Sequence, residues 1–196
     1  MTYSLGDVKI LVVEDMQPML SLTKSILSIM GFKNLIGARS GDEGYEMFCK
    51  HNPDIVISDW LMEPEDGLEL INKIRKDPAS PNPYAPIILM TGYSNRLRVE
   101  MARDGGITEF LVKPYTAKDL YNRLVQIIEK PRQFVVSETF FGPDRRRRRD
   151  EDYEGPSRRK TDDYIVESSA SSEQTPEERK AGEQILKKMR EDTSKI

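Results

Sequence analysis

The chain has 196 residues, of which 32% are charged and 37% hydrophobic, and its formal net charge is −3. Its longest uninterrupted apolar runs, such as Ile10 to Val13, are far shorter than the roughly 20 residues that span a bilayer, and no secretion signal is visible. We therefore expect a cytoplasmic protein without a membrane span. One cysteine and one histidine exclude an internal disulfide and the usual Cys/His zinc sites, so a bound metal would be a hard ion held by oxygen.

The composition divides the chain after residue 130. Residues 131–196 carry equal numbers of basic and acidic residues at higher density than residues 1–130, and they contain few aliphatic residues. Such a stretch buries too little apolar surface to offset its conformational entropy, which predicts a mostly disordered charged tail. The predicted division is a domain over 1–130, a charged low-complexity linker over 131–174 and a short amphipathic helix over 175–196. The linker contains Phe140-Phe141-Gly142-Pro143-Asp144 followed by five arginines.

Short apolar runs alternate with helical patterns in residues 1–130, which is typical of a parallel α/β sheet covered by helices on both faces. The pattern predicts five strands, over Val8–Val13, Asn34–Ala38, Ile55–Ser58, Ile87–Met90 and Ile107–Val112. A helix is predicted after each strand: the first over Met16–Met30 with the inward stripe Met19, Leu22, Ile26 and Ile29, the second capped by Ser40, and the third with the inward residues Leu68, Ile71 and Ile74. The fourth helix is predicted over Asn95–Asp104, and the fifth has the inward stripe Leu120, Leu124, Ile127 and Ile128. These elements form five βα units.

Polar residues follow the predicted strands at the edge where open α/β sheets bind ligands. Glu14 and Asp15 follow the first strand, Asp59 the third, Thr91 the fourth and Lys113 the fifth. Crowded carboxylates repel one another, and an octahedral divalent cation such as Mg²⁺ relieves that repulsion. Its natural third partner is a phosphoryl group. Each residue alone also has an ordinary structural interpretation, as a helix start, a turn or a cap.

Taken together and in order, these motifs resemble the receiver domain of two-component response regulators of the chemotaxis type. The resemblance covers residues 8–130 and rests on Glu14-Asp15, on Asp59-Trp60 with Met62 and Asp66-Gly67, on Thr91-Gly92 and on Lys113-Pro114. It implies a doubly wound (βα)5 flavodoxin-like fold, a histidine kinase or phosphotransfer protein as partner, and Mg²⁺ as cofactor, with Mn²⁺ as an alternative. The chain departs from the family at Glu63, where a proline usually follows Met62.

The resemblance also implies a role for each site residue. Asp59 would be the phosphoacceptor, and the metal would be held by Glu14, Asp15, Asp59 and the backbone carbonyl of Leu61. The phosphoryl group would be contacted by Thr91 and by Lys113, which Pro114 would orient. The conformational switch would consist of Thr91 and Phe110. We further hypothesise that Leu61 and Tyr93 hinder the hydrolytic water. No enzymatic activity is expected beyond self-catalysed phosphotransfer to Asp59 and autodephosphorylation.

Several functions are compatible with this reading. The first is a response regulator that signals by protein–protein contact, because the tail shows no DNA-binding domain. The alternatives are a receiver that gates an arginine-rich tail for nucleic acid or anionic lipid, and a phosphate shuttle in a phosphorelay. Nucleic-acid binding is disfavoured because acidic residues bring the net charge of residues 144–154 to zero, and the two phenylalanines could instead anchor the segment on the domain or on a partner. The kinase, the downstream target and a homodimer stay open.

Overall fold

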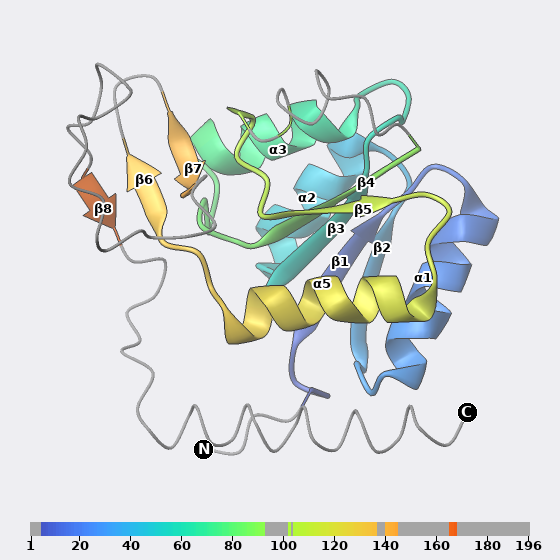
Figure 1. The fold of residues 1–196 in the computed structure, drawn as a ribbon. Helices are drawn as coiled ribbons and strands as arrows, with labels where there is room; N and C mark the ends of the chain where they lie inside the picture. The colour runs from blue at the N-terminus through green and yellow to red at the C-terminus, as the bar shows by residue number, and fades with distance from the viewer. Residues whose placement is uncertain (1–4, 93–101, 103, 137–139, 145–164, 168–196) are drawn as a thin grey trace.

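The computed structural model describes residues 5–92, 102, 104–136, 140–144 and 165–167 (Figure 1). Its main sheet has five strands in the order β2-β1-β3-β4-β5, and every neighbouring pair is parallel. The strands are β1 Lys9–Val13, β2 Asn34–Ala38, β3 Ile55–Asp59, β4 Ile87–Thr91 and β5 Glu109–Val112. The predicted flavodoxin-like parallel sheet is confirmed by this strand order.

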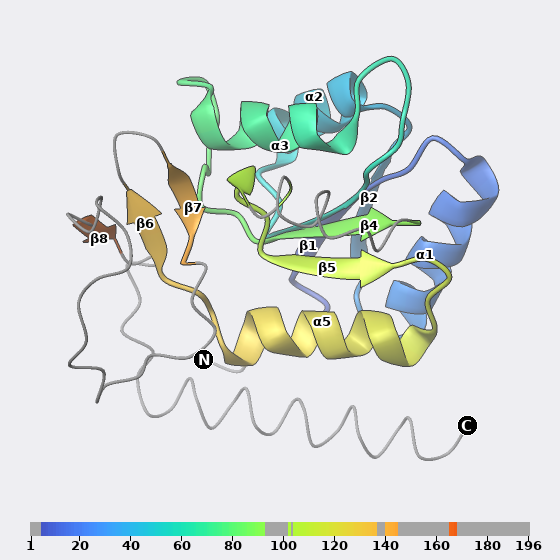
Figure 2. The ribbon, with the colours of Figure 1, turned by 45° about the horizontal axis from the view of Figure 1, so that its top comes forward.

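Helices cover both faces of the sheet, as Figures 1 and 2 show. The described helices are α1 Gln17–Ile29, α2 Gly41–His51, α3 Gly67–Lys76 and α5 Ala117–Glu129. Phe48 of α2 and Ile71 of α3 pack on one face, and Leu27 of α1 and Leu124 of α5 pack on the other. The predicted helix over Asn95–Asp104 falls mostly outside the described residues, although Ala102 and Asp104 are helical.

Side-chain caps begin three of these helices. The predicted cap at Ser40 is confirmed, because its hydroxyl accepts a hydrogen bond from the backbone N–H of Glu43. Asp66 and Thr116 each form a full capping box at the starts of α3 and α5. These caps fix where the loops that follow the strands end.

The predicted inward stripe of α1 is wrong at Leu22 and Ile29, whereas Ile26 packs against the core and Met19 is half-buried. Leu22 is 50% exposed and Ile29 is 76% exposed, whereas Leu20, Thr23 and Leu27 are the buried residues of this helix. The buried face of the helix therefore includes Thr23 and not the predicted positions Leu22 and Ile29. The Thr23 hydroxyl lies 2.6 Å from Tyr115 Oη and 2.9 Å from the Met19 carbonyl oxygen, so it has hydrogen-bond partners on that face. A buried hydroxyl with hydrogen-bond partners costs little, so a polar residue can lie on the inner face.

The described fold continues past residue 130 into a second, antiparallel sheet of order β7-β6-β8. Its strands are β6 Phe134–Val136, β7 Phe141–Pro143 and β8 Ile165–Glu167. Phe134 and Val135 are buried, and Phe141 lies against Tyr84. This contact agrees with the interpretation of the Phe-Phe segment as an anchor on the domain. The arginine run and the predicted helix over 175–196 lie outside the described residues. No described helix combines the length and apolarity needed to cross a membrane.

Candidate functional site

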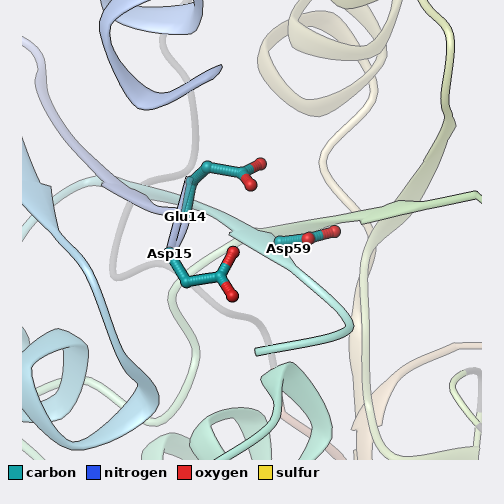
Figure 3. Close-up of side chains that lie close together, drawn as sticks. All are labelled: Glu14, Asp15 and Asp59. Atoms are coloured by element: carbon teal, nitrogen blue, oxygen red, sulfur yellow. The ribbon is translucent and has the colours of Figure 1, made fainter. Parts of the chain in front are cut away.

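Three carboxylates converge at the carboxyl-terminal edge of the main sheet (Figure 3). Glu14 and Asp15 follow β1, and Asp59 ends β3, which is the parallel neighbour of β1. One carboxylate oxygen from each residue lies within 4.8 Å of the others. Glu14 is fully buried and Asp59 is only 8% exposed, so water screens their mutual repulsion poorly. The structure therefore brings together the predicted acidic set.

Lys113 supplies the cation of this site. Its Nζ lies 2.7 Å from Glu14 Oε2 and 3.0 Å from Asp59 Oδ2. The backbone N–H of Lys113 donates to the Thr91 carbonyl, which continues the pairing of β4 with β5 and fixes where the lysine leaves the sheet. The Lys113–Pro114 peptide is cis, and Thr91 is buried at the end of β4.

Burial dominates the electrostatics of the site. Desolvation raises the pKa of Asp59 and of Glu14 above their ordinary values, although hydrogen bonds from Lys113 oppose the rise in both cases. Burial alone would lower the pKa of Lys113, but its hydrogen bonds to Glu14 and Asp59 outweigh that effect and raise it. Lys113 pairs with two of the three carboxylates, Glu14 and Asp59, and is the one cation that pairs with them among the described residues. The described site is therefore short of positive charge.

The donor set fits Mg²⁺. Its ligands are oxygens, as this hard cation requires. Glu14 Oε1 is buried and has no hydrogen-bond partner among the described residues, which leaves one oxygen available to a cation or to water bound to it. The acidic pocket of Glu14, Asp15 and Asp59 is thus suited to a divalent ion beside a phosphorylated aspartate.

The loop after Asp59 is held close to that residue. Asp59 Oδ1 accepts a hydrogen bond from the Trp60 N–H at 2.8 Å, and the Gly67 N–H donates to the Trp60 carbonyl at 2.8 Å. A Cβ at Gly67 would collide with the Asp59 carbonyl oxygen, so this approach requires glycine. Leu61 is half-exposed at the start of the loop.

The two proposed switch residues lie on neighbouring strands. Thr91 ends β4 and is buried, while Phe110 of β5 is partly buried against the core. The Phe110 ring stacks with Trp60, with centroids 6.5 Å apart. An aromatic path therefore joins β5 to the residue that follows Asp59. Tyr93 lies outside the described residues.

One ionic cluster near this loop was not among the predicted site residues. Lys73 Nζ of α3 lies 2.9 Å from the carboxylates of Asp42 at the start of α2 and of Glu65 in the loop before α3. Glu65 is buried, and a Cβ at Gly41 would lie 2.9 Å from its side chain. This cluster ties the loop that follows Asp59 to α2. The residues are distant in sequence and form no local motif, so no pattern indicated the cluster.

Comparisons with known proteins agree with this geometry. The chain is 32% identical over 124 residues to chemotaxis protein CheY-3 of Vibrio cholerae, covering 63% of this chain and 94% of that protein. It is 30% identical over 122 residues to chemotaxis protein CheY of Pseudomonas aeruginosa, covering 62% and 97%. The solved structure of CheY4 of Vibrio cholerae superposes with a TM-score of 0.57 at 24% identity over 61% of this chain and 98% of that one, a likeness of fold alone. The profile of the response regulator receiver domain matches residues 10–125, so the chain belongs to the receiver-domain family.

Proposed function

We propose that this protein is a two-component response regulator that accepts a phosphoryl group on Asp59 from a histidine kinase or a phosphotransfer protein. The proposal rests on the position of Asp59. Its carboxylate lies 3.0 Å from Lys113 Nζ, and one of its oxygens lies within 4.8 Å of a carboxylate oxygen of Glu14 and of Asp15, close enough for the three to bind one metal ion. The same arrangement is expected of a carboxylate nucleophile held beside a cation.

Mg²⁺ would be held by the carboxylates of Glu14, Asp15 and Asp59 together with the backbone carbonyl of Leu61. When bound, it neutralises negative charge on the transferring phosphoryl group. Mn²⁺ has the same preference for oxygen ligands and is the alternative ion.

The remaining steps of phosphotransfer are carried out by side chains of this protein. An Asp59 carboxylate oxygen attacks phosphorus, the P–N bond to the donor imidazole breaks, and an acyl phosphate forms on Asp59. Lys113, freed from Asp59, pairs with a phosphoryl oxygen. Thr91 donates its hydroxyl to the phosphoryl group, and Pro114 orients Lys113. No other catalytic set is proposed.

The output is a change in protein–protein contact. Phe110 lies on the strand between Glu109 and Lys113 and stacks on Trp60 beside the acceptor. Movement of Thr91 toward the phosphoryl group would leave space that the Phe110 ring enters, which alters the surface of β5 and α5. Arg145 to Arg149 lie outside the described residues, so the gating of a nucleic-acid or lipid contact by these arginines stays an alternative.

Intact mass after incubation with a small phosphodonor tests the proposal. Wild type should gain one phosphoryl group when Mg²⁺ is present and none when it is chelated, and Asp59→Asn should gain none. Asp54→Asn is the matched control, because Asp54 lies at the opposite end of β3 and bonds the Lys9 N–H. A gain by Asp59→Asn, or no gain by wild type under any condition, would contradict the assignment of Asp59.

A further inference from the structure

The loop between β3 and α3 is closed at its base by a backbone hydrogen bond. The Gly67 N–H donates to the Trp60 carbonyl oxygen at 2.8 Å. Leu61, whose backbone carbonyl is the proposed fourth ligand of the metal ion, is the first residue inside the closed loop. Its neighbours Trp60 and Met62 are both buried in the core. The base of the loop and the Met62 side chain therefore fix one end of the segment that presents the Leu61 carbonyl.

The far side of the loop is held by Glu65. Glu63 and Pro64 are exposed, whereas Glu65 is only 8% exposed although its side chain can carry a charge. Its carboxylate lies 2.9 Å from Lys73 Nζ of α3. Burial raises the pKa of Glu65, and the hydrogen bond from Lys73 opposes that rise and favours the carboxylate. A buried carboxylate without a partner is costly, so this position of the loop depends on Lys73.

The start of α2 contacts the same part of the loop. A Cβ at Gly41 would lie 2.9 Å from the Glu65 carbonyl oxygen and 2.9 Å from its Cγ. The loop backbone therefore lies directly against the first residue of α2, and the approach requires glycine there. Asp42, the next residue, also pairs with Lys73 at 2.9 Å. Because α2 and α3 lie side by side on one face of the sheet, one ammonium joins both helices to the loop (Figures 1 and 2).

The two ion pairs of Lys73 have equal lengths but differ in their shielding from water. The side chain of Glu65 is 11% exposed and that of Asp42 is 64% exposed, while that of Lys73 is 39% exposed. An exposed pair contributes little, because water competes for both groups, and a shielded pair contributes more. The Lys73 ammonium also lies 5.9 Å from the centroid of the Tyr45 ring, which packs against the core. The pair with Glu65 is therefore the contact that holds the loop.

We propose that Glu65 and Lys73 are positioning residues for the metal site, because their ion pair holds the loop in the conformation in which the Leu61 carbonyl joins the three carboxylates as a ligand. The inference rests on the proposed function, since it requires a divalent cation at that site. Neither residue binds the ion; both act through the backbone of residues 61–65. Mg²⁺ demands precisely placed oxygens, and outer partners that hold a ligand in place strengthen metal binding.

Electrostatics and positioning predict opposite effects when Lys73 is neutralised. Lys73→Met removes a positive charge, so charge alone would leave Mg²⁺ binding unchanged or make it tighter. Loss of the ion pair frees the loop, so positioning predicts weaker binding. Glu65→Gln combined with Lys73→Met keeps the net charge of wild type and leaves neither partner as an unpaired buried charge. Charge alone predicts no change for this double variant, whereas positioning again predicts weaker binding.

Mg²⁺ titration of the full chain, followed by the fluorescence of Trp60, tests the proposal. Lys73→Met and the double variant should each raise the dissociation constant of Mg²⁺ about tenfold, the low end of the effect of outer partners on metal affinity. Lys73→Arg keeps the charge and the donors, so it should stay within about threefold of wild type. Asp42→Asn removes only the exposed pair and should change the constant less than about threefold. Lys76→Met, on the exposed last turn of the same helix, is the matched control and should not weaken binding.

Two further measurements separate positioning from a general loss of stability. The rate of mass gain at saturating Mg²⁺ should stay near that of wild type in Lys73→Met, while the Mg²⁺ concentration that gives half of this rate should rise with the dissociation constant. Urea unfolding without Mg²⁺ reports stability alone. A lower urea midpoint with an unchanged Mg²⁺ dissociation constant would overturn the positioning role. If wild type neither binds Mg²⁺ nor gains mass, the proposed function fails and the inference fails with it, whereas a wild type that does both while Lys73→Met binds Mg²⁺ equally well rejects the inference alone.

Discussion

The ammonium of Lys113 lies 3.0 Å from the carboxylate of Asp59 and is the nearest positive charge to the proposed phosphoacceptor among the described residues. Lys113 also pairs with Glu14 at 2.7 Å. In the resting state its single positive charge is therefore shared by two of the carboxylates that a divalent cation would use. Under the proposed function, the lysine and the metal ion would compete for the same negative charge before phosphotransfer and would act together on the phosphoryl group during it.

Replacing this lysine should separate the two effects. Lys113→Met should bind Mg²⁺ about tenfold more tightly, because a nearby positive charge is lost. It should also accept a phosphoryl group about a hundredfold more slowly, because a preorganised cation is missing from the transition state. Mg²⁺ titration followed by the fluorescence of Trp60, the single tryptophan, and the rate of mass gain measure the two quantities. Lys118→Met, on the exposed start of α5, is the control. Weaker Mg²⁺ binding by Lys113→Met would contradict the competition.

The raised pKa of Asp59 predicts how stability depends on pH in the absence of Mg²⁺. Because burial raises this pKa in the folded state, the favourable contribution of the protonated acid is present below the unfolded pKa and is lost as the pH rises through the folded pKa. Asp59→Asn carries no charge, so at neutral pH it should melt a few degrees above wild type, the shift that about 1 kcal/mol produces. The difference should shrink as the pH falls. Thermal melts across this range check it, and a difference that grows on acidification would refute it.

Gly67 should be required for the position of Asp59. Gly67→Ala places a Cβ against the Asp59 carbonyl oxygen and 3.0 Å from Leu89 Cδ1, so it should cost about 1–3 kcal/mol of unfolding free energy and weaken Mg²⁺ binding. Gly37→Ala is the matched control, because its Cβ would make only ordinary contacts at 3.5 Å. Urea unfolding of both variants gives the comparison. Equal stability of the two variants would mean that the loop shifts without cost.

The site was predictable because its signals are local. Glu14, Asp15 and Asp59 each end a short apolar run, and parallel strands bring such ends to one edge. The inner face of α1 was not predictable in the same way. Leu22 and Ile29 are apolar yet exposed, while Thr23 is polar yet buried, so periodicity alone assigns these three positions to the wrong sides of the helix.

The hairpin of β6 and β7 was missed for a different reason. Its composition was averaged with that of a charged tail, which hides the few apolar residues Phe134, Val135 and Phe141. The surface that binds them comes from Tyr84 and Gly106, which are far away in sequence. A segment without a core of its own can still fold on a neighbouring domain, and no local pattern shows that neighbour.

Leu61 and Tyr93 should lengthen the life of the phosphorylated state. The Leu61 side chain is half-exposed next to Asp59, where it would hinder the approach of a hydrolytic water. Replacing both residues by alanine should shorten the half-life of the phosphorylated protein severalfold, as measured by loss of the added mass. Leu22→Ala, which removes an equally exposed leucine from α1, should leave the half-life unchanged. An unchanged half-life in the double variant would refute the role.

Arg132 should anchor the hairpin to β5 more strongly than Arg123 anchors α5. Both arginines pair with the buried Glu109, but Arg132 does so at 2.7 Å with its side chain 20% exposed, and Arg123 at 3.4 Å with 39% exposed. A short, shielded ion pair is worth more than a long, solvated one.

Arg132→Ala should therefore cost about 1–3 kcal/mol of the local free energy that protects the β6 and β7 amides from hydrogen exchange, since Glu109 loses its closer partner in a buried place. Arg123→Ala should cost less than about 1 kcal/mol at the same amides. A double-mutant cycle with Glu109→Gln assigns the loss to the ion pair, because Arg132→Ala should have little further effect once the carboxylate is gone. If the β6 and β7 amides are equally protected from hydrogen exchange in the two arginine variants, the aromatic contacts and not the Arg132–Glu109 ion pair stabilise the hairpin.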